Sequence, residues 1–372
     1  MLKKTFALLA GLAFALTAYA ATTHLKPGHP DRYVVKKGDT LWDISARFLV
    51  KPWFWPEIWQ ANPQVHNPHL IYPGDVLNLA YDHGPTLKLS PSIHEGESPV
   101  AAIPLSDLEM FLKEMRVVDP DQLAQSPYVM AFEENQLRGM PGKFIYVRQI
   151  DAQPGQRYAV VRPSHLFRQF GEDGKNRDRV AHELESNVEM VRGPWKEDFR
   201  HDGHYGHGRE LGVEVQVIGT AEVLRDGDPA SLLVTDSTME IRKGDRLLPI
   251  DDHPYDPYYF PHAPEALPAN ARVIAFAEGL YAVGKRQVVA LSVGSEDGID
   301  NGTTFSVLQP GKRVHDDVSG YALHSSLGEH VTLPDEYVGH VMVFRTFKHV
   351  SYALIMDGIR PVKKWDKLAM PE

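Results

Sequence analysis

Five short blocks rich in Val, Tyr, Phe and Thr occur twice in this 372-residue chain, in the same order both times. The matching blocks are 129–133 with 273–277, 155–163 with 302–310, 215–223 with 341–349, 233–236 with 354–357, and 241–247 with 362–368. One such match arises easily by chance, but five in the same order do not. The residue types favour strands. The sequence therefore predicts two related β domains in its C-terminal three-quarters.

Alternation of apolar and polar residues is clearest at 214–217 and 340–343. Such alternation means that one face of each strand meets water, which predicts antiparallel sheets or barrels with packed interiors. We place a helix and the first repeat in residues 105–250 and the second repeat in 270–372. The Pro-rich stretch 249–268 joins them.

The first repeat also carries a long charged insertion between Arg168 and Arg209. An insertion of this length and polarity predicts a surface loop. Within it, the segment from His201 to His207 contains three histidines and one aspartate. Imidazole and carboxylate groups are ligands for zinc or copper, but the spacing matches no metallopeptidase signature, and its glycines favour a solvated loop.

The first twenty residues have the pattern of a secretory signal peptide. Lys3 and Lys4 precede an apolar run over residues 6–16, and Ala-Tyr-Ala at 18–20 gives the small-x-small pattern of a cleavage site. The run is too short for a stable membrane span. Residues 1–20 therefore predict export to the periplasm, with a short buried N-terminal helix as the alternative. No later stretch of 18 apolar residues predicts another membrane span.

Charge and cysteine content exclude several classes of function. The formal net charge is −10, and removing residues 1–20, which contain two lysines and no acid, makes it −12. A net acidic chain without a basic run does not suit a nucleic-acid-binding protein. The chain has no cysteine, which excludes lipidation through an N-terminal cysteine, disulfides, thiolate catalysis and thiolate metal sites.

Residues 32–80 predict a small domain with the order strand, helix, helix, strand. Residues 33–35 form the first strand, and apolar spacing predicts a helix over 40–48 that Asp39 or Thr40 caps. Pro52 begins a second helix that extends to about Ala61, and 76–79 form the last strand after a Pro-Gly turn.

Two segments connect this small domain to the β region. Four prolines in residues 81–104 predict a linker or extended strap. A helix then begins at Ser106, where Ser-Asp-Leu-Glu forms a capping box, and extends to about Arg116.

Two motifs in the small domain together identify its family. Residues 33–45 read YVVKKGDTLWDIS, and residues 67–77, after Asn-Pro at 62–63, read NPHLIYPGDVL. Both resemble the two ends of a LysM domain, at the separation that the family has. Between them, residues 50–59 contain three tryptophans and two prolines, which resembles a variant in exported proteobacterial LysM proteins. The resemblance covers roughly 50 of the 372 residues.

The LysM resemblance implies a shallow groove that binds glycans containing N-acetylglucosamine, here peptidoglycan strands. Its lining, carried over by motif, is Gly38, Asp39, Thr40 and Leu41 on one side and Leu70, Ile71 and Tyr72 on the other. Glycine allows a tight turn and close approach of a sugar. Backbone groups of these loops can pair with the donor and acceptor of each acetamido group. Leu41, Ile71 and Tyr72 offer apolar contact for the acetyl methyl group.

Several aromatic and aliphatic residues of this domain are more easily explained by packing than by ligand contact. Trp42, Ile44, Ile58 and Val76 are expected in the core rather than on the ligand. Trp53, Trp55 and Trp59 could form an aromatic platform for a sugar, but packing of a small domain is the favoured use. One groove of this kind binds weakly, and tight retention would need several copies.

Catalytic signatures are missing from the sequence. His182-Glu183 lacks the second histidine of a zincin helix, no Gly-x-Ser-x-Gly elbow occurs, and the acidic pairs at 296–297 and 316–317 suit turns better than glycosidase chemistry. We therefore expect no enzyme activity, no cofactor and no resident metal. A cell-wall hydrolase with its site in the β region is the enzymatic alternative, and an oligomeric envelope scaffold is a third interpretation.

The sequence thus predicts an α+β protein, with a small βααβ LysM module followed by a mostly antiparallel β region made of two related repeats. Peptidoglycan glycan strands are the expected partner, and other envelope proteins are candidates for the β repeats. No nucleic acid and no membrane span after signal cleavage are expected.

Overall fold

The computed structural model describes twelve segments of the chain. They are residues 25–56, 71–81, 85–90, 103, 108–109, 111–112, 114–134, 136–169, 209–250, 259–277, 282–316 and 329–371. The predicted signal peptide 1–20, the predicted groove residue Leu70 and the histidine segment 201–207 lie outside these residues. In the described residues, no helix has the length and apolarity needed to cross a membrane.

The N-terminal module consists of a three-stranded antiparallel sheet and a short helix. Strands β1 (Arg32–Val34), β2 (Val76–Tyr81) and β3 (Pro85–Ser90) lie in the order β1-β2-β3. Helix α2 (Leu41–Phe48) begins at Thr40, whose hydroxyl accepts a hydrogen bond from the Asp43 amide at 3.1 Å. The helix buries Leu41, Trp42, Ile44, Ser45 and Phe48, as its apolar spacing predicts.

Two details of this module differ from the sequence prediction. The second helix starts at Pro52 as expected, first as the 3-10 turn η1 (Pro52–Phe54) and then as α-helix at residues 55–56, and residues 57–70 are outside the described part. The stretch interpreted as a linker contains β3, in which Pro85 is the first residue. Proline is compatible with that position because it need not donate to the ladder there.

The middle of the chain forms a sheet that closes on itself. Its strands are β4 (Met115–Val118), β5 (Tyr128–Phe132), β6 (Phe144–Arg148), β7 (Arg157–Gln169), β8 (Arg209–Arg225), β9 (Ala230–Ser237) and β10 (Arg246–Pro249), with helix α5 (Pro120–Gln125) between β4 and β5. The order is β4-β8-β7-β10-β5-β6-β9, and an additional β8–β9 pairing closes six of these strands into a barrel. We call it barrel 1. The charged insertion connects β7 to β8.

The predicted helix from Ser106 ends earlier than expected. Residues 108, 109, 111 and 112 are helical, but Met115–Val118 is strand β4, not the end of the helix. The β-branched residues Val117 and Val118 pair with Glu214 and Val213 of β8, so sheet pairing prevails over helix continuation there.

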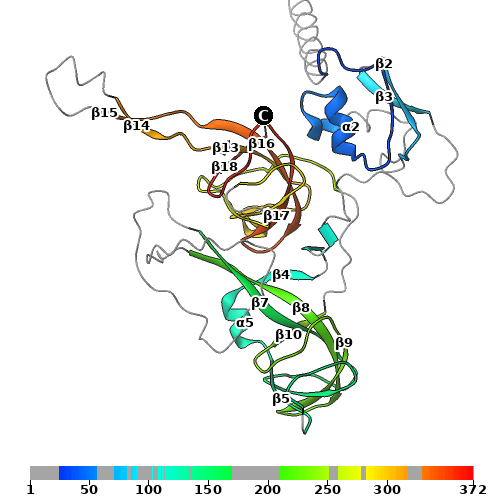
Figure 1. Ribbon diagram of the computed structural model, residues 1–372, viewed down its shortest axis with the longest axis vertical. Coiled ribbons are helices and arrows are strands. Elements are labelled where there is room, and N and C mark those ends of the chain that lie inside the picture. The colour runs from blue at the N-terminus through cyan, green and yellow to red at the C-terminus, as the bar shows by residue number, and fades with distance from the viewer. Residues whose placement is uncertain are drawn as a thin grey trace, which may run out of the picture.

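The C-terminal part of the chain forms a second barrel. Its strands are β11 (Val273–Phe276), β12 (Val288–Leu291), β13 (Thr304–Gln309), β16 (Glu336–Thr346), β17 (Ser351–Gly358) and β18 (Lys367–Ala369), and the 3-10 turn η2 (Ser295–Asp297) follows β12. The order is β11-β12-β17-β16-β13-β18, and a bridge between Arg272 and Lys367 brings the two ends together. We call it barrel 2. Strands β14 (Arg313–Asp316) and β15 (Glu329–Thr332) form a two-stranded arm that extends from it (Figure 1).

The strands of the two barrels follow one another in the same order. Starting from β5, barrel 1 runs β5-β6-β9-β8-β7-β10, and starting from β11, barrel 2 runs β11-β12-β17-β16-β13-β18. The five pairs of sequence blocks lie on or next to strands in equivalent places of these two orders.

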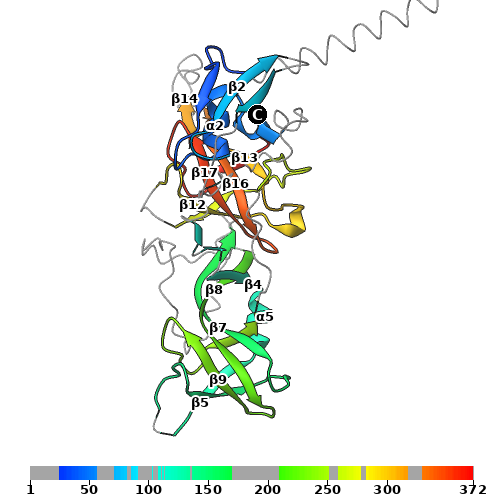
Figure 2. The ribbon, with the colours of Figure 1, turned by 90° about the vertical axis from the view of Figure 1, so that its right-hand side faces the viewer.

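The three bodies lie in a row, but not in chain order. Figure 2 shows the N-terminal module at one end, barrel 2 in the middle and barrel 1 at the other end. One cluster of buried apolar residues continues from the module, with Trp42 and Trp55, into barrel 2, with Met342 and Tyr352. The module is therefore packed on the domain that is farther from it in sequence.

A polar and aromatic joint connects the two barrels. The Tyr352 hydroxyl donates to the buried Glu214 carboxylate, and the Arg345 guanidinium donates to the Phe111 carbonyl oxygen at 2.7 Å. The Phe111 ring packs edge-on against Tyr352, with 5.8 Å between the ring centroids. Burial and the neighbouring Glu214 charge raise the pKa of the Tyr352 hydroxyl, so it remains a donor.

Candidate glycan-binding site

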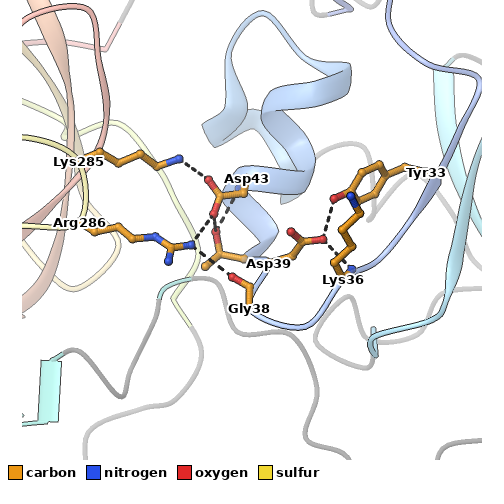
Figure 3. Close-up of polar contacts among 8 residues, drawn as sticks. Tyr33, Lys36, Gly38, Asp39, Asp43, Lys285 and Arg286 are labelled. Carbon is orange, nitrogen blue, oxygen red and sulfur yellow. Dashed lines mark hydrogen bonds and ion pairs between the residues drawn. The ribbon is translucent and has the colours of Figure 1, made fainter.

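The loop before α2 is a tight turn that one carboxylate holds in place. The Asp39 carboxylate accepts hydrogen bonds from the Lys36 amide and the Tyr33 hydroxyl, both at 2.8 Å (Figure 3). Gly38 lies between them with φ +89°, a conformation that disfavours every residue with a side chain. Burial, followed by the hydrogen bond to Asp39, raises the pKa of Tyr33. The Asp39 and Tyr33 side chains thus fix the shape of the turn, and Gly38 is exposed at its tip.

A second turn of the same kind precedes β2. The Asp75 carboxylate accepts a hydrogen bond from the Tyr72 amide at 2.9 Å, and Gly74 has φ +94°. Two backbone hydrogen bonds join this turn to the end of β1, from Gly74 to Val35 at 2.8 Å and from Val35 to Asp75 at 2.9 Å. The two loops that the motifs predict as groove walls therefore lie at the same end of the β1–β2 pair.

The predicted lining residues differ widely in exposure. Gly38 is exposed, and Asp39 and Tyr72 are half-buried. Thr40 is 5% exposed and serves as the cap of α2, whereas Leu41 and Ile71 are 0% exposed. Apolar contact from the Leu41 and Ile71 side chains, which the sequence suggested, is therefore not available on this surface, because both belong to the core. Leu41 is the first residue of α2, directly after the first loop, and Ile71 lies in the second loop.

The described tryptophans of the module are buried. Trp42, Trp53 and Trp55 are 1%, 4% and 0% exposed. The Trp53 ring lies 4.3 Å from the ring of His340 in barrel 2, and Trp55 lies 5.9 Å from the ring of Phe260. These two tryptophans therefore form the contact with barrel 2 rather than a sugar platform, and Trp59 lies outside the described residues.

Two cations from barrel 2 reach the first loop, and sequence reasoning missed both. Lys285 Nζ lies 2.5 Å from Asp43 Oδ1, and Arg286 Nη2 lies 3.2 Å from Asp43 Oδ2 (Figure 3). The same Arg286 nitrogen donates to the Gly38 carbonyl oxygen at 3.3 Å. Burial pulls the pKa of Asp43 upward, but hydrogen bonds and charge from Lys285, aided by Thr40 and Arg286, hold it below its ordinary value.

The turn that carries these cations has a counterpart in barrel 1. In barrel 2, the Arg286 amide donates to Ile355 and the Gln287 amide to Gly284; in barrel 1, the Gly142 amide donates to Val234 and the Lys143 amide to Met140. Residues 141 and 142 are Pro-Gly, whereas residues 285 and 286 are Lys-Arg. Alignment of the two turns in the sequence would have singled out Lys285 and Arg286, because two cations replace Pro-Gly there.

Arg286 occupies a backbone conformation in which its counterpart is glycine. Its φ is +66°, against +79° for Gly142. A left-handed conformation costs a residue with a Cβ about 1–2 kcal/mol. Ion pairs between half-exposed groups return about 0.2–1 kcal/mol each, and the Lys285 and Arg286 side chains are 51% and 46% exposed. The ion pairs thus roughly offset the backbone strain, so Lys-Arg in place of Pro-Gly does not clearly stabilise the fold.

Within the described residues, no group of three or more His, Asp or Glu side chains has the arrangement needed to hold a metal ion.

Comparison with known protein families identifies the N-terminal module. The model of the LysM domain family matches residues 33–80. Residues 33–80 form a LysM domain. The LysM domain thus covers both β1 and β2 and the two loops between which the family places its groove. A family description of this kind implies binding of peptidoglycan or N-acetylglucosamine glycans in general.

A relative of this LysM region is the "Uncharacterized protein YqbP" of Bacillus subtilis (strain 168). It is 37% identical over 60 residues, which cover 13% of this chain and 27% of that protein. The chain therefore spans only about a quarter of the length of this relative.

Proposed function

We propose that this protein is an exported envelope protein that binds peptidoglycan non-covalently through its LysM domain. The observation that carries the proposal is the pair of carboxylate-braced turns at one end of β1 and β2, with Gly38 exposed at φ +89°. The pattern of residues 1–20 supports export to the periplasm. The space beside the Gly38 Cα is open, because a Cβ added there would have no atom within 4 Å, so a sugar can approach the turn closely from that side.

The ligand contacts in this proposal come mainly from backbone groups of the Gly38–Thr40 and Ile71–Tyr72 loops, with the half-buried Tyr72 side chain as the apolar contact. Leu41 and Ile71 support the loops from the core, and Leu70 remains a predicted contact. The backbone groups of these loops are uncharged, which suits N-acetylglucosamine, whose acetamido group offers one donor and one acceptor.

For the rest of the chain, we propose that the two barrels are duplicated interaction or scaffolding domains and that the protein is not an enzyme. The shared strand order and the five ordered sequence blocks support duplication. A cell-wall hydrolase is the alternative. Clearing of peptidoglycan in a zymogram by the purified protein would favour the hydrolase, and intact peptidoglycan would favour the binding role.

The test of glycan binding compares two glycine variants in the full-length mature chain. Gly38→Ala adds a Cβ at the proposed contact surface, and Gly28→Ala adds one in a turn with φ +75° that also has open space around it. Gly28 precedes β1, and its turn is bonded to Phe48 at the opposite end of α2, about 12 Å away along the helix. The two variants therefore carry similar backbone strain in different places.

We expect Gly38→Ala to weaken retention on insoluble peptidoglycan about fivefold or more, equivalent to about 1 kcal/mol, and Gly28→Ala to leave it unchanged. Equal retention of both variants would contradict the placement of the groove. Point variants are preferable to removal of residues 32–80, because the LysM core is continuous with barrel 2.

A further inference from the structure

We propose that Lys285 and Arg286 form an anion-binding subsite at the rim of the LysM groove, which takes the carboxylates of peptidoglycan stem peptides. This inference rests on the proposed function and names which part of the ligand a second domain recognises. The groove itself offers neutral backbone groups, whereas stem peptides are the part of peptidoglycan that carries free carboxylates.

The position of the two cations supports this assignment. Arg286 Nη2 lies 3.3 Å from the Gly38 carbonyl oxygen, so the guanidinium is adjacent to the exposed backbone where the glycan would lie. Figure 3 shows both side chains approaching the start of α2 from barrel 2, on the side away from Tyr33 and Lys36. A peptide that extends sideways from a bound glycan would meet this turn.

The balance of charge at the rim also favours an anion. Among the described residues, these two cations pair with one carboxylate, Asp43, in a chain whose formal net charge is −10. Both contacts of Arg286 leave from one terminal nitrogen, and a guanidinium has five N–H donors in a planar fork that fits carboxylates. With side chains that are 51% and 46% exposed, Lys285 and Arg286 can reach a ligand from the solvent.

The backbone of the turn gives an independent reason. The equivalent turn in barrel 1 has Pro141-Gly142, the residues that this conformation favours, and it has no LysM domain beside it (Figure 1). Barrel 2 places Arg286 at φ +66° instead. Residues kept in unfavourable backbone conformations are found preferentially at ligand sites. A local requirement for cations at this turn accounts for the presence of Lys285 and Arg286 where barrel 1 has Pro-Gly.

The counterpart turn supplies the test variant. Lys285→Pro together with Arg286→Gly gives barrel 2 the barrel 1 turn, which suits the backbone and should not impair folding. The probes are a disaccharide-tetrapeptide fragment of peptidoglycan and an N-acetylglucosamine tetramer, which has no peptide, measured by calorimetry at low and high salt. Lys312→Gln with Arg313→Gln, on the exposed arm, removes the same charge elsewhere and is the matched control.

We expect the turn variant to lose about tenfold in affinity for the peptide-bearing fragment and less than twofold for the tetramer. The control variant should change neither. Added salt should reduce the parent's preference for the peptide-bearing fragment, because half-exposed charges are screened. Asp43→Asn, which removes the competing carboxylate, should raise the ratio of the two affinities.

Equal losses for both probes would show that the turn only holds the LysM domain in place, and a gain for both would show that it blocks the groove. Either result, or no change, overturns the subsite. If the parent protein fails to bind the tetramer at all, the proposed glycan function itself fails. The two failures are therefore distinguishable.

Discussion

Asp245→Asn removes the counter-charge of an arginine that is buried in barrel 1. Arg162 Nε and Nη2 donate to the two Asp245 carboxylate oxygens at 2.7 and 2.8 Å. The side chains are 5% and 2% exposed. Removing one partner of such a pair typically costs about 3–5 kcal/mol, because the remaining charge has lost its solvation and its counter-ion.

Two contacts that survive the substitution set the expected value within that range. Arg162 Nη2 also donates to the Glu240 carbonyl oxygen at 2.8 Å, and an asparagine oxygen can still accept one of the two bonds. We therefore expect a loss near the lower limit, about 3 kcal/mol. For a domain of this size, that loss lowers Tm by roughly 10 °C.

The assay is amide hydrogen exchange followed by mass spectrometry, because it reports on barrel 1 separately from the other bodies. Exchange should accelerate in β7 and β10 of the variant, while β12 and β17 of barrel 2 remain unchanged. Arg162→Gln with Asp245→Asn removes both charges, and it should recover at least half of the loss. A cost of Asp245→Asn below about 1 kcal/mol would refute the argument that the pair is electrostatically buried.

Three further predictions concern other parts of the molecule. Burial raises the pKa of Asp366 to about 6; since the folded state then holds this proton more tightly than the unfolded chain, stability falls as pH rises from about 4 to 6. Asp366→Asn removes that titration, so its Tm relative to the parent should increase between pH 4 and pH 7 in thermal melts, and a constant difference would contradict the raised pKa. Leu41→Ala leaves a cavity at a 0% exposed site, so it should lower the free energy of unfolding in urea by about 2–5 kcal/mol and should also weaken retention on peptidoglycan. A loss of stability under about 1 kcal/mol would place Leu41 outside the core. Phe111→Ala should cost about 3–5 kcal/mol and accelerate hydrogen exchange in both β8 and β17, because the ring packs at the joint between the barrels; a change in one strand alone would contradict that role.

The predictable part of the fold came from local patterns. The Leu41, Ile44 and Phe48 spacing located helix α2, and Thr40 is its cap as expected. Alternation at 214–217 and 340–343 located strands β8 and β16. The prediction that one face meets water there was wrong, because the polar residues Glu214, Gln216 and His340 are buried as well. These features are encoded within a few residues, which is why the sequence alone indicates them.

The wrong predictions about the fold arose where two local sequence patterns favoured different structures. The prolines of residues 81–104 hid the alternation of Thr86-Leu87-Lys88-Leu89 in β3. The capping box at Ser106 suggested a long helix, although the partner of β4 is almost 100 residues later in the chain. Pairing with a distant strand leaves no mark in the local pattern.

The candidate site was predictable to the same degree. The two motifs located both loops, with Gly38, Asp39 and Tyr72 on or near the surface. Motif transfer did not separate exposed residues from supporting ones, so Leu41 and Ile71 were expected on the surface and are in the core. Exposure depends on how the LysM domain packs, not on the motif itself.

The contact of Lys285 and Arg286 with the first loop lay beyond local reasoning. A separation of 242 residues lies between Lys285 and Asp43. The LysM domain packs on barrel 2 and not on barrel 1, which follows it in the chain (Figure 2). Only the tertiary arrangement shows which turn of the β region faces the groove.

Hydrogen exchange of the whole protein, with and without an N-acetylglucosamine oligomer, tests the glycan groove most directly. We predict slower exchange on addition of the oligomer, confined to residues 36–41 and to the segment around Tyr72. Unchanged exchange in both loops at saturating oligomer, or protection located only in the barrels, would contradict the proposal that the LysM loops bind the glycan.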